Sequence, residues 1–402
     1  MKMSKKLNFE HTKMACYIAG FTQAVVCGFL PLLFVTFNQM YQIPLTLITL
    51  LVAVNFIVQF GMDFAALFFV DKVSYRGVVV AAHILISIGL LLLGTLVHVA
   101  KNTYLAIFLA TLLFSAGGGL LEVMTSPIME GCPSKNKAAA MSLLHSMFGF
   151  GSVAVVILTN VLLFALGREK WYLIAIVWAF VPALNAMLFS LVPINKIVSD
   201  DEKVPILRLF KGKSFLIFLL IMACSGASEI GMSQWASAFA ETSLGVSKAV
   251  GDILGPCIFA LMMALSRLFY AKIADRINLV RYIMICGSLT VVCFLFAALL
   301  PFRFAALLAC GFCGFTVGIM WPGTLSLAAK VYPAGGATMF GVLALAGDFG
   351  CTTGPSIVGF IASMFGGELR TGLLAATVFP LILVLGAFLL IRREKRHPAK
   401  YF

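Results

Sequence analysis

The stretch Asn195–Lys213 reads NKIVSDDEKVPILRLFKGK, and it is the only long polar interruption inside an otherwise apolar sequence. On both sides of it, long apolar runs alternate with short loops that contain Gly, Pro and charged residues. A run of about twenty apolar residues has the length that crosses the ~30 Å hydrocarbon core of a bilayer. The sequence therefore predicts an all-α integral membrane protein with a polar linker near the middle of the chain.

The apolar runs predict six membrane-spanning helices before the linker and six after it. The first six are expected at 13–38, 44–70, 77–99, 102–129, 137–165 and 171–193. The second six are expected at 214–240, 247–271, 280–299, 303–329, 335–364 and 371–391. We therefore expect two six-helix bundles with domain limits 1–193 and 214–402, joined by a cytoplasmic linker over 194–213.

The composition excludes most classes of soluble protein. Hydrophobic residues make up 61% and charged residues 11% of the 402 residues, whereas soluble domains have about 45–50% and about 25%. The net charge of +13 does not indicate nucleic-acid binding, because the basic residues occupy short gaps instead of one folded polar face. The ten cysteines lie mostly inside apolar runs, which disfavours a disulfide framework, and we expect no metal and no cofactor.

The basic residues predict the orientation of the chain. Loops on one predicted face carry most of the 29 Lys and Arg residues. The opposite face holds only Lys101, Arg168, Lys170, Lys248, Arg303 and Arg370. The positive-inside rule places the basic face in the cytoplasm, so both termini are expected there and the protein is expected in the cell (plasma or inner) membrane.

The two halves of the sequence repeat each other. The loop DKVSYR at 71–76 follows the second predicted helix, and DRINLVR at 275–281 follows the eighth, 204 residues later. Gly118 and Pro133 recur 200 residues later as Gly318 and Pro333. A duplicated set of six helices is one of the architectures of secondary transporters, which bind their substrate near the membrane midplane at the repeat interface.

These repeated loops resemble the loop between helices two and three of the major facilitator superfamily, with Ser74 in place of the family's Gly. The resemblance implies twelve transmembrane helices in two bundles and transport by alternating access. It also implies a gate at the cytoplasmic side, where we expect inter-helix salt bridges that break when the interface repacks. The expected gate charges are Asp71, Arg76, Asp275, Arg276 and Arg281.

Within that superfamily, the fourth predicted helix resembles that of the fucose-permease-like sugar symporters, because GGGLLE at 117–122 precedes Ser126-Pro127. MSLLH at 141–145 resembles the fifth helix of the same family, and EIG at 229–231 with the following Gln234-Trp235 resembles the seventh. Two positions depart from the family: Cys27 stands where its first helix has an Asp linked to proton coupling, and Ser126 replaces an Asn. The resemblance implies proton-coupled sugar symport.

Glu122 and His145 are the candidates for proton coupling. A charged side chain at the bilayer centre costs about 2.5–3.5 kcal/mol to insert, so one retained there indicates function. Glu122 lies roughly 10 Å inside the end of its helix at 1.5 Å per residue, and His145 is expected at a similar depth. In contact, the two would form a pair able to take up and release a proton at physiological pH. A static hydrogen-bonded brace is the alternative for both residues.

Other polar side chains inside the predicted spans are candidates for substrate binding. Asn55 and Gln59 recur at a spacing of four in the second helix, on one face. Polar contact between helices is the alternative reading of this stripe. Trp235 and Trp321 with the amide of Gln234 would suit a sugar's CH face and hydroxyls. The full set is Gln23, Asn55, Gln59, Glu122, Glu229, Gln234, Trp235, Trp321 and Asp348.

Arg267 and Asp348 have a second interpretation. Arg267 is expected roughly 12 Å inward of the Asp275 loop at 1.5 Å per residue, and we assign it to the cytoplasmic gate. Asp348 lies between Gly347 and Gly350, where a close contact between helices is the default expectation and a site role is the alternative.

The expected function is uptake of a small polar solute, a sugar or related polyol, by proton-coupled symport, with sodium as the alternative ion. The expected protein is a monomer in the lipid bilayer. The alternative is a proton-coupled drug or metabolite efflux antiporter, although FGFGS at 148–152 lacks the Gly-Pro element of drug exporters. No enzyme is expected, because the sequence shows no nucleophile with a base beside it, and a channel would repeat a pore loop or a ring of charges.

Overall fold

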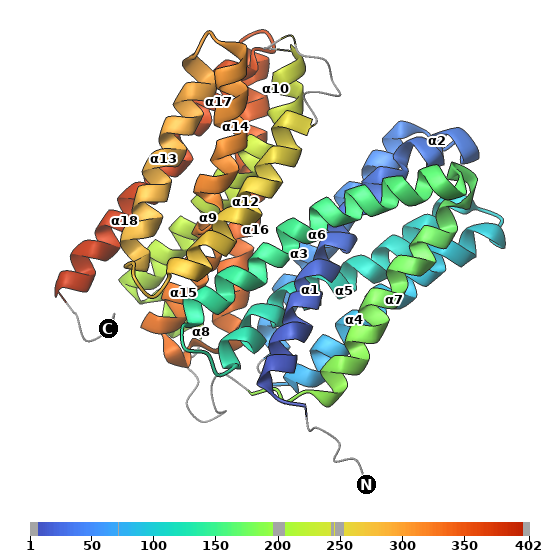
Figure 1. Ribbon diagram of the computed structural model, residues 1–402, viewed down its shortest axis with the longest axis horizontal. Helices are drawn as coiled ribbons and strands as arrows, with labels where there is room; N and C mark the ends of the chain where they lie inside the picture. The colour runs from blue at the N-terminus through green and yellow to red at the C-terminus, as the bar shows by residue number, and fades with distance from the viewer. Residues whose placement is uncertain (1–6, 71, 196–205, 243–244, 246–252, 397–402) are drawn as a thin grey trace. The chain divides into compact units, whose positions relative to one another are not determined.

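The computed structural model describes residues 7–70, 72–195, 206–242, 245 and 253–396 (Figure 1). Within these residues the regular elements are helices, and no strand occurs. Eleven segments of the described chain are long and apolar enough to cross a membrane, and Ala53–Phe69 is a further, shorter apolar helix. The predicted all-α fold with about twelve transmembrane helices is confirmed, and the protein is a multi-pass membrane protein.

The chain forms two compact units. The first unit contains Met1–Pro133, Phe150–Asp201 and Gly336–Gly341, and the second contains Ser134–Gly149, Glu202–Gly335 and Val342–Phe402. Residues 196–205 of the predicted linker lie outside the described residues. The domain limits expected from the sequence, and the cytoplasmic position of the termini, therefore stay predictions.

The helices of the first unit follow the predicted spans closely. They are α1 (Phe9–Gly28), η1 (Leu30–Leu33), α2 (Phe34–Tyr41), α3 (Leu45–Phe69), α4 (Tyr75–Thr95), η2 (Leu96–His98), α5 (Thr103–Gly131), η3 (Arg168–Lys170) and α7 (Trp171–Leu191). The long helix α6 (Lys137–Leu166) contributes its part from Phe150 onwards to this unit. The helix α5 packs against α1, α3 and α4.

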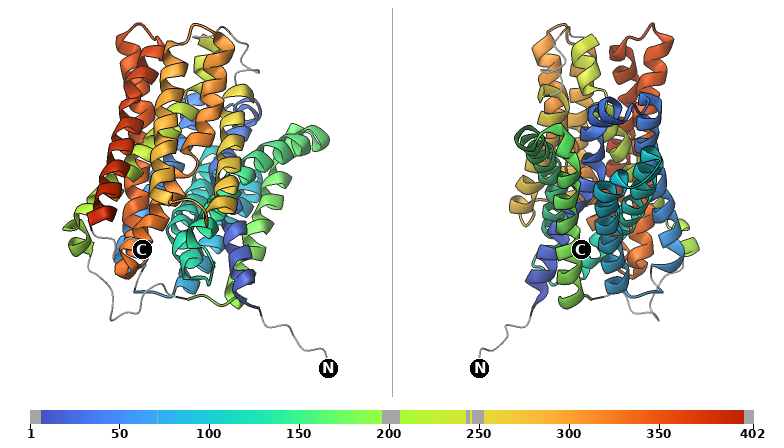
Figure 2. Two further views of the ribbon diagram at one scale, coloured as in Figure 1. Left: turned by 60° about the vertical axis from the view of Figure 1, so that its left-hand side comes forward. Right: turned by 90° about the vertical axis from the view of Figure 1, so that its right-hand side faces the viewer.

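The second unit contains the first part of α6 and the helices after the linker. They are α8 (Ile206–Phe210), α9 (Lys213–Ser233), α10 (Ala236–Thr242), the π-helical turn η5 (Ile253–Cys257), α12 (Ile258–Ile273), α13 (Leu279–Leu299), α14 (Arg303–Val317), α15 (Met320–Val331), η6 (Pro333–Gly335), α16 (Gly336–Met364), α17 (Leu369–Ala376) and α18 (Val378–Arg396). The helix α13 lies beside α14 and α18, as the orange and red ribbons of Figure 2 show.

Several predicted spans are interrupted helices. The first predicted span is divided into α1, η1 and α2 around Pro31, and the tenth is divided into α14 and α15 just before Pro322. A proline has no N–H and cannot close the intrahelical bond to the residue four positions earlier. Such breaks are tolerated in membranes where neighbouring side chains satisfy the freed carbonyl.

Buried polar side chains join the helices of the first unit. His83 on α4 lies 2.8 Å from the amide nitrogen of Asn185 on α7, and Asn185 also donates to the backbone oxygen of Ala15 on α1 at 3.0 Å. The other ring nitrogen of His83 lies 2.7 Å from the backbone oxygen of Val79. Hydrogen bonds between spans are one of the forces that hold helices together in lipid, and this network fixes α1, α4 and α7.

Candidate functional site

Three of the predicted site residues meet inside the first unit. The amide nitrogen of Gln23 on α1 donates to the side-chain oxygen of Gln59 on α3 at 2.8 Å and lies 3.3 Å from Oε2 of Glu122 on α5. Gln59 is only 5% exposed. We call Gln23, Gln59 and Glu122 the amide–carboxylate cluster. Because two amides and one carboxylate converge from three helices, the cluster offers both donors and acceptors in an apolar surrounding.

Glycines of α5 make room for this cluster. A Cβ atom at Gly118 would lie 2.8 Å from a methyl carbon of Val26 and 3.2 Å from Oε1 of Gln59. A Cβ atom at Gly119 would lie 2.7 Å from the backbone oxygen of Gln59. The glycines therefore allow a close approach of α3 to α5, which brings the Gln59 amide beside α5.

Two further side chains extend this polar region, Asn55 on α3 and Cys27 on α1. Asn55, which is 4% exposed, accepts a hydrogen bond from the hydroxyl of Ser115 on α5 at 2.6 Å. Cys27 lies 4.0 Å from both the Gln23 nitrogen and the Gln59 oxygen. Asn55 thus makes a polar contact between α3 and α5, which was the alternative role expected for the polar residues of this helix. Cys27 borders the amide–carboxylate cluster.

The second unit contains a buried arginine with four connections. Nη2 of Arg267 on α12 lies 3.6 Å from Oε2 of Glu229 on α9, with side-chain exposures of 4% and 14%. Nε of Arg267 donates to the backbone oxygen of Gly318 at 2.8 Å, and Nη1 donates to the backbone oxygen of His145 on α6 at 2.9 Å. Ser142 on α6 donates its hydroxyl to the backbone oxygen of Arg267 at 2.6 Å.

These contacts attach the first part of α6 to α12 through two hydrogen bonds, one donated by each helix. Arg267 donates to α6, and its own carbonyl accepts from α6. Gly149 on α6 completes the contact, because a Cβ atom there would lie 2.8 Å from the Cβ atom of Ala264 on α12. All three nitrogens of the guanidinium face a protein oxygen, so Arg267 is a structural connection in this state, as expected for a gate residue. The assignment to a gate stays a prediction.

His145 enters this cluster through its backbone carbonyl. It lies in the second unit, whereas Glu122 lies in the first. The expected pairing of the Glu122 carboxylate with the His145 imidazole therefore stays a prediction.

The two predicted tryptophans contact the same helix at different heights. Nε1 of Trp235 donates to the backbone oxygen of Pro355 at 2.9 Å, and its ring borders Gly359 on α16. The ring of Trp321 on α15 lies against Gly347 on α16. Gly347 and Gly359 are twelve residues apart, which is roughly 18 Å along a helix at 1.5 Å per residue. The two rings thus contact α16 at separate positions, and the expected binding of a sugar by Trp235 and Trp321 stays a prediction.

The remaining site candidates of the second unit are placed separately. Gln234 is exposed at the end of α9. Asp348 follows Gly347 on α16 and is half-buried. The glycine beneath Trp321 confirms the close helix contact expected beside Asp348, and the role of Asp348 in substrate binding stays a prediction.

The predicted gate charges form hydrogen bonds in place of the expected salt bridges where contacts are described. Nη1 of Arg76 donates to the backbone oxygens of Phe189 and Ser190 at 2.9 and 2.6 Å, and so caps the last turn of α7, whose carbonyls have no intrahelical partner. Asp275 accepts from the amide of Asn136 at 2.6 Å. The other two described charges, Arg276 and Arg281, are exposed, and Asp71 lies outside the described residues.

Sequence reasoning missed Ser142, Asn136 and the pairing of Arg267 with Gly318. A signal for the last of these was present. Pro322 stands four residues after Gly318, so the Gly318 carbonyl loses its helical donor, and a buried arginine on a neighbouring helix is the type of group that can replace it.

Buried polar clusters inside an apolar helical fold of this kind define a membrane transport protein. The chain belongs to the Major Facilitator Superfamily, since the family model matches residues 15–351 and, again, residues 257–401. The resemblance stated from the sequence is thereby confirmed. No curated protein sequence matches the chain.

Solved structures of two sugar transporters share the fold. The chain is similar to FucP, a Major Facilitator Superfamily transporter in the outward conformation, with 14% identity, a TM-score of 0.80 and coverage of 94% of this chain and 98% of FucP. A second structure, of the E. coli fucose:proton symporter FucP, has a TM-score of 0.75. The proton:xylose symporter XylE has 11% identity and a TM-score of 0.79, with coverage of 96% of this chain and 95% of XylE. At these identities the likeness shows the fold alone.

Proposed function

We propose that this transporter moves a small polar solute, a sugar or related polyol, together with protons by alternating access. The amide–carboxylate cluster of Gln23, Gln59 and Glu122 is the observation that carries the proposal. Sugars and polyols present hydroxyls that donate and accept hydrogen bonds at the same time. Amide side chains also do both, whereas a carboxylate accepts, so the cluster matches the hydrogen-bonding capacity of such a solute.

An unpaired oxygen in this cluster supports the proposal. Oε1 of Gln23 is buried and has no hydrogen-bond partner among the described residues. A buried polar atom that lacks a partner costs about 1–3 kcal/mol. A substrate hydroxyl that donates to Oε1 would recover this free energy, which gives the site a reason to bind a hydroxylated solute.

Glu122 is the proposed proton carrier. It is the one carboxylate of the cluster, and its Oε2 lies 3.3 Å from an amide nitrogen. A carboxylate inside a membrane-spanning helix is stable only when it is protonated, hydrogen-bonded or in contact with water. Loss and gain of a proton at Glu122 would therefore alter the cluster that binds substrate, which links the two events. His145 is the proposed second proton site.

We propose that the protein is a monomer in the cell membrane, and its basic loops support a cytoplasmic position of both termini. The structural neighbours FucP and XylE are proton symporters of sugars, and they motivate the choice of solutes to test.

The test is uptake of labelled hexoses, pentoses and polyols into proteoliposomes with the purified protein. We expect accumulation of at least one solute when the lumen is alkaline, and loss of that accumulation when a protonophore is added. Gln23→Leu should abolish uptake, whereas Gln39→Leu should leave it unchanged, because Gln39 is exposed on α2. Uptake driven by a sodium gradient alone, or expulsion of hydrophobic dyes without any sugar uptake, would contradict the proposal.

A further inference from the structure

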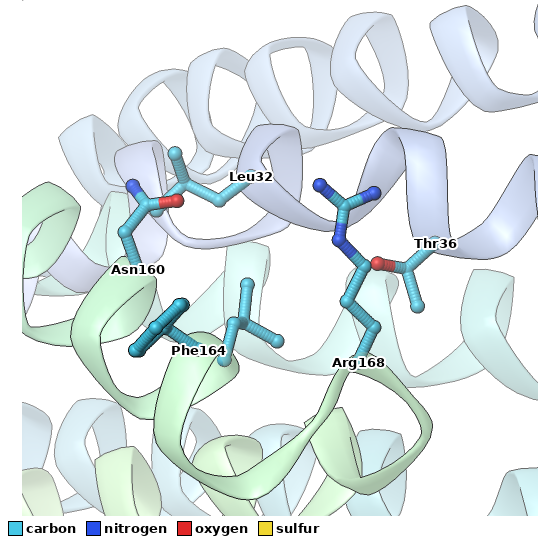
Figure 3. Close-up of a pocket in the computed structure, with 6 residues that line it drawn as sticks. Leu32, Thr36, Asn160, Phe164 and Arg168 are labelled. Atoms are coloured by element: carbon cyan, nitrogen blue, oxygen red, sulfur yellow. The ribbon is translucent and has the colours of Figure 1, made fainter.

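A cavity with no part in the proposed transport step lies in the first unit. It has a volume of ≈ 340 Å³ and is lined by Leu32, Thr36, Asn160, Leu163, Phe164 and Arg168 (Figure 3). These residues belong to η1, α2, the last turns of α6, and η3. The cavity is thus formed where the first and fifth predicted spans end.

The polar groups of the cavity keep hydrogen-bonding capacity that the described residues do not use. Thr36 is 3% exposed and lines the cavity, yet its hydroxyl has no hydrogen bond within the described chain. The guanidinium of Arg168 likewise has neither an ion pair nor a hydrogen bond among the described residues. Asn160 donates its amide nitrogen to Val156 at 2.8 Å, so its amide oxygen remains available. Thr36 is a buried residue and Arg168 is exposed at the rim of the cavity, and a hydroxyl donor beside a cation without a counter-ion indicates a site for an anion.

The cavity lies at the level where a bilayer changes from hydrocarbon to headgroups. Arg168 follows the last residue of α6 by two positions, and Asn160 precedes it by six. At 1.5 Å per residue, Asn160 is roughly 9 Å deeper than the end of the helix. The headgroup regions add about 5–8 Å to each side of the hydrocarbon core. One ligand in this cavity would therefore have its charged part at the interface and its apolar part in the core.

The apolar wall of the cavity continues onto the outer surface of the helix. Phe164 is 93% exposed, and Val161, one turn below it, is 56% exposed. Large apolar side chains exposed beside a cation at the end of a membrane-spanning helix can contact the apolar part of an amphipathic molecule while the cation binds its charged part. A free sugar would leave Arg168 without a counter-ion, and a free phosphate would leave this apolar surface uncovered.

We propose that this cavity binds the headgroup of an anionic phospholipid. The planar fork of Arg168 binds two phosphate oxygens at once, and the hydroxyl of Thr36 donates to the same phosphate. The amide oxygen of Asn160 accepts from a headgroup hydroxyl, as phosphatidylglycerol offers. The acyl chains lie along Phe164. The bound lipid joins η3, just after α6, to α2 through one shared phosphate.

Native mass spectrometry of the full-length protein tests this site. Protein in mild detergent is incubated with equal amounts of phosphatidylglycerol and phosphatidylcholine. We expect the wild type to retain one phosphatidylglycerol in at least tenfold preference. Arg168→Ala should reduce that retention at least tenfold, and Thr36→Val should reduce it severalfold. Lys170→Ala is the matched control, because Lys170 is exposed in the same turn and does not line the cavity.

Three results would overturn the proposal. The first is equal retention of the two lipids by the wild type. The second is unchanged retention of phosphatidylglycerol in Arg168→Ala when the variant unfolds at the wild-type temperature. The third is displacement of the lipid by soluble glycerol phosphate at an equal concentration, which would identify a site for small anions. An Arg168→Lys variant that retains the charge should recover part of the preference, since a lysine binds phosphate as a point charge.

Discussion

Arg267 donates its Nε–H to the backbone oxygen of Gly318 at 2.8 Å, and that oxygen is available because Pro322 stands four residues later. In an uninterrupted helix the N–H of residue 322 would bind the Gly318 carbonyl. Proline lacks this N–H, and the helix is divided into α14 and α15 at this point. A proline in one helix thus creates the acceptor that fixes an arginine of another helix.

The first prediction concerns Pro322→Ala. Alanine restores an N–H that can bind the Gly318 carbonyl, so that the carbonyl no longer depends on Arg267. In the wild type, Arg267→Leu should cost about 1–3 kcal/mol for the unpaired Gly318 acceptor, in addition to the loss of its other contacts. In the Pro322→Ala background this part of the cost should disappear. Unfolding in detergent of the wild type, the two single variants and the double variant measures this double-mutant cycle. If the losses in the free energy of unfolding are strictly additive, the restored N–H of residue 322 does not replace Arg267 as the donor to Gly318.

The second prediction concerns the pair Arg267 and Glu229. Removal of one partner leaves a buried charge, so Arg267→Leu or Glu229→Leu alone should lower the free energy of unfolding by about 3–5 kcal/mol. The double variant should lose less free energy of unfolding than the two single variants lose together, because no unpaired charge remains. Glu10→Leu provides a control, since the Glu10–Lys13 pair is solvent-exposed at Glu10 and exposed pairs contribute about 0–1 kcal/mol. Equal costs at Glu10 and Glu229 would refute this prediction.

The helices could be predicted from the sequence because lipid imposes a length and a composition on every span. The predicted 137–165 and 280–299, for example, are observed as Lys137–Leu166 and Leu279–Leu299. The internal breaks were not predicted. A break such as that before Pro322 leaves the run apolar, so hydropathy does not record it, and its effect depends on which neighbour reaches the freed carbonyl.

The candidate site was predictable in part for the same reason. Gln23, Gln59 and Glu122 stood out as polar residues inside apolar runs. For the two tryptophans the sequence indicates the helix on which each lies, but not the height at which each ring contacts α16, because that depends on the neighbouring helix. Ser142 was missed, since a serine in a membrane helix usually binds its own backbone, and nothing local distinguishes one that bonds to a neighbour.

The third prediction tests the close approach at the amide–carboxylate cluster. In Gly118→Ala the new Cβ lies 3.2 Å from Oε1 of Gln59, and in Gly119→Ala it lies 2.7 Å from the Gln59 backbone oxygen. The new Cβ in Gly118→Ala also lies 2.8 Å from a methyl carbon of Val26. Side chains yield more easily than a backbone, so Gly118→Ala should reduce transport with a smaller loss of stability than Gly119→Ala, which should reduce both. Gly61→Ala on α3 is the control, because its Cβ meets no atom within 4 Å. Uptake assays and thermal unfolding of the three variants provide the comparison.

In the control, alanine should be neutral or stabilise α3 by up to about 1 kcal/mol, the difference in helix propensity between the two residues. If Gly118→Ala transports as well as Gly61→Ala does, the position of the Gln59 amide has no role in transport.

The fourth prediction concerns Asp275, which lies in the loop after α12, and Asn136, which directly precedes α6. Asp275 accepts from Asn136 at 2.6 Å, in the same unit as the contacts of Ser142 and Arg267. Asp275→Ala and Asn136→Ala should each free the start of α6, and the double variant should add little to either. Labelling of a cysteine introduced at Lys137 should become severalfold faster in both variants. Arg281→Ala is the control, because Arg281 is exposed; unchanged labelling accompanied by lost substrate binding would refute the gate role.

The last prediction concerns Glu122 and separates its three possible roles. Glu122→Gln keeps the size of the side chain and one acceptor oxygen, but it cannot release a proton. The amide of Gln23 can still donate to that oxygen, as it does to Oε2 of Glu122 at 3.3 Å. If Glu122 carries the coupling proton, the variant should still exchange labelled substrate across the membrane.

Accumulation driven by a pH gradient should then be lost in Glu122→Gln, because movement of substrate no longer requires movement of a proton. If Glu122 only binds substrate, exchange and accumulation should fail together. If it only braces the helices, both should persist while the unfolding temperature falls. His145→Gln is the companion variant: a shared proton site gives it the same phenotype, whereas a separate role leaves gradient-driven accumulation intact. Full accumulation by Glu122→Gln, with the substrate confirmed, would exclude the proton role, since no other carboxylate belongs to the amide–carboxylate cluster.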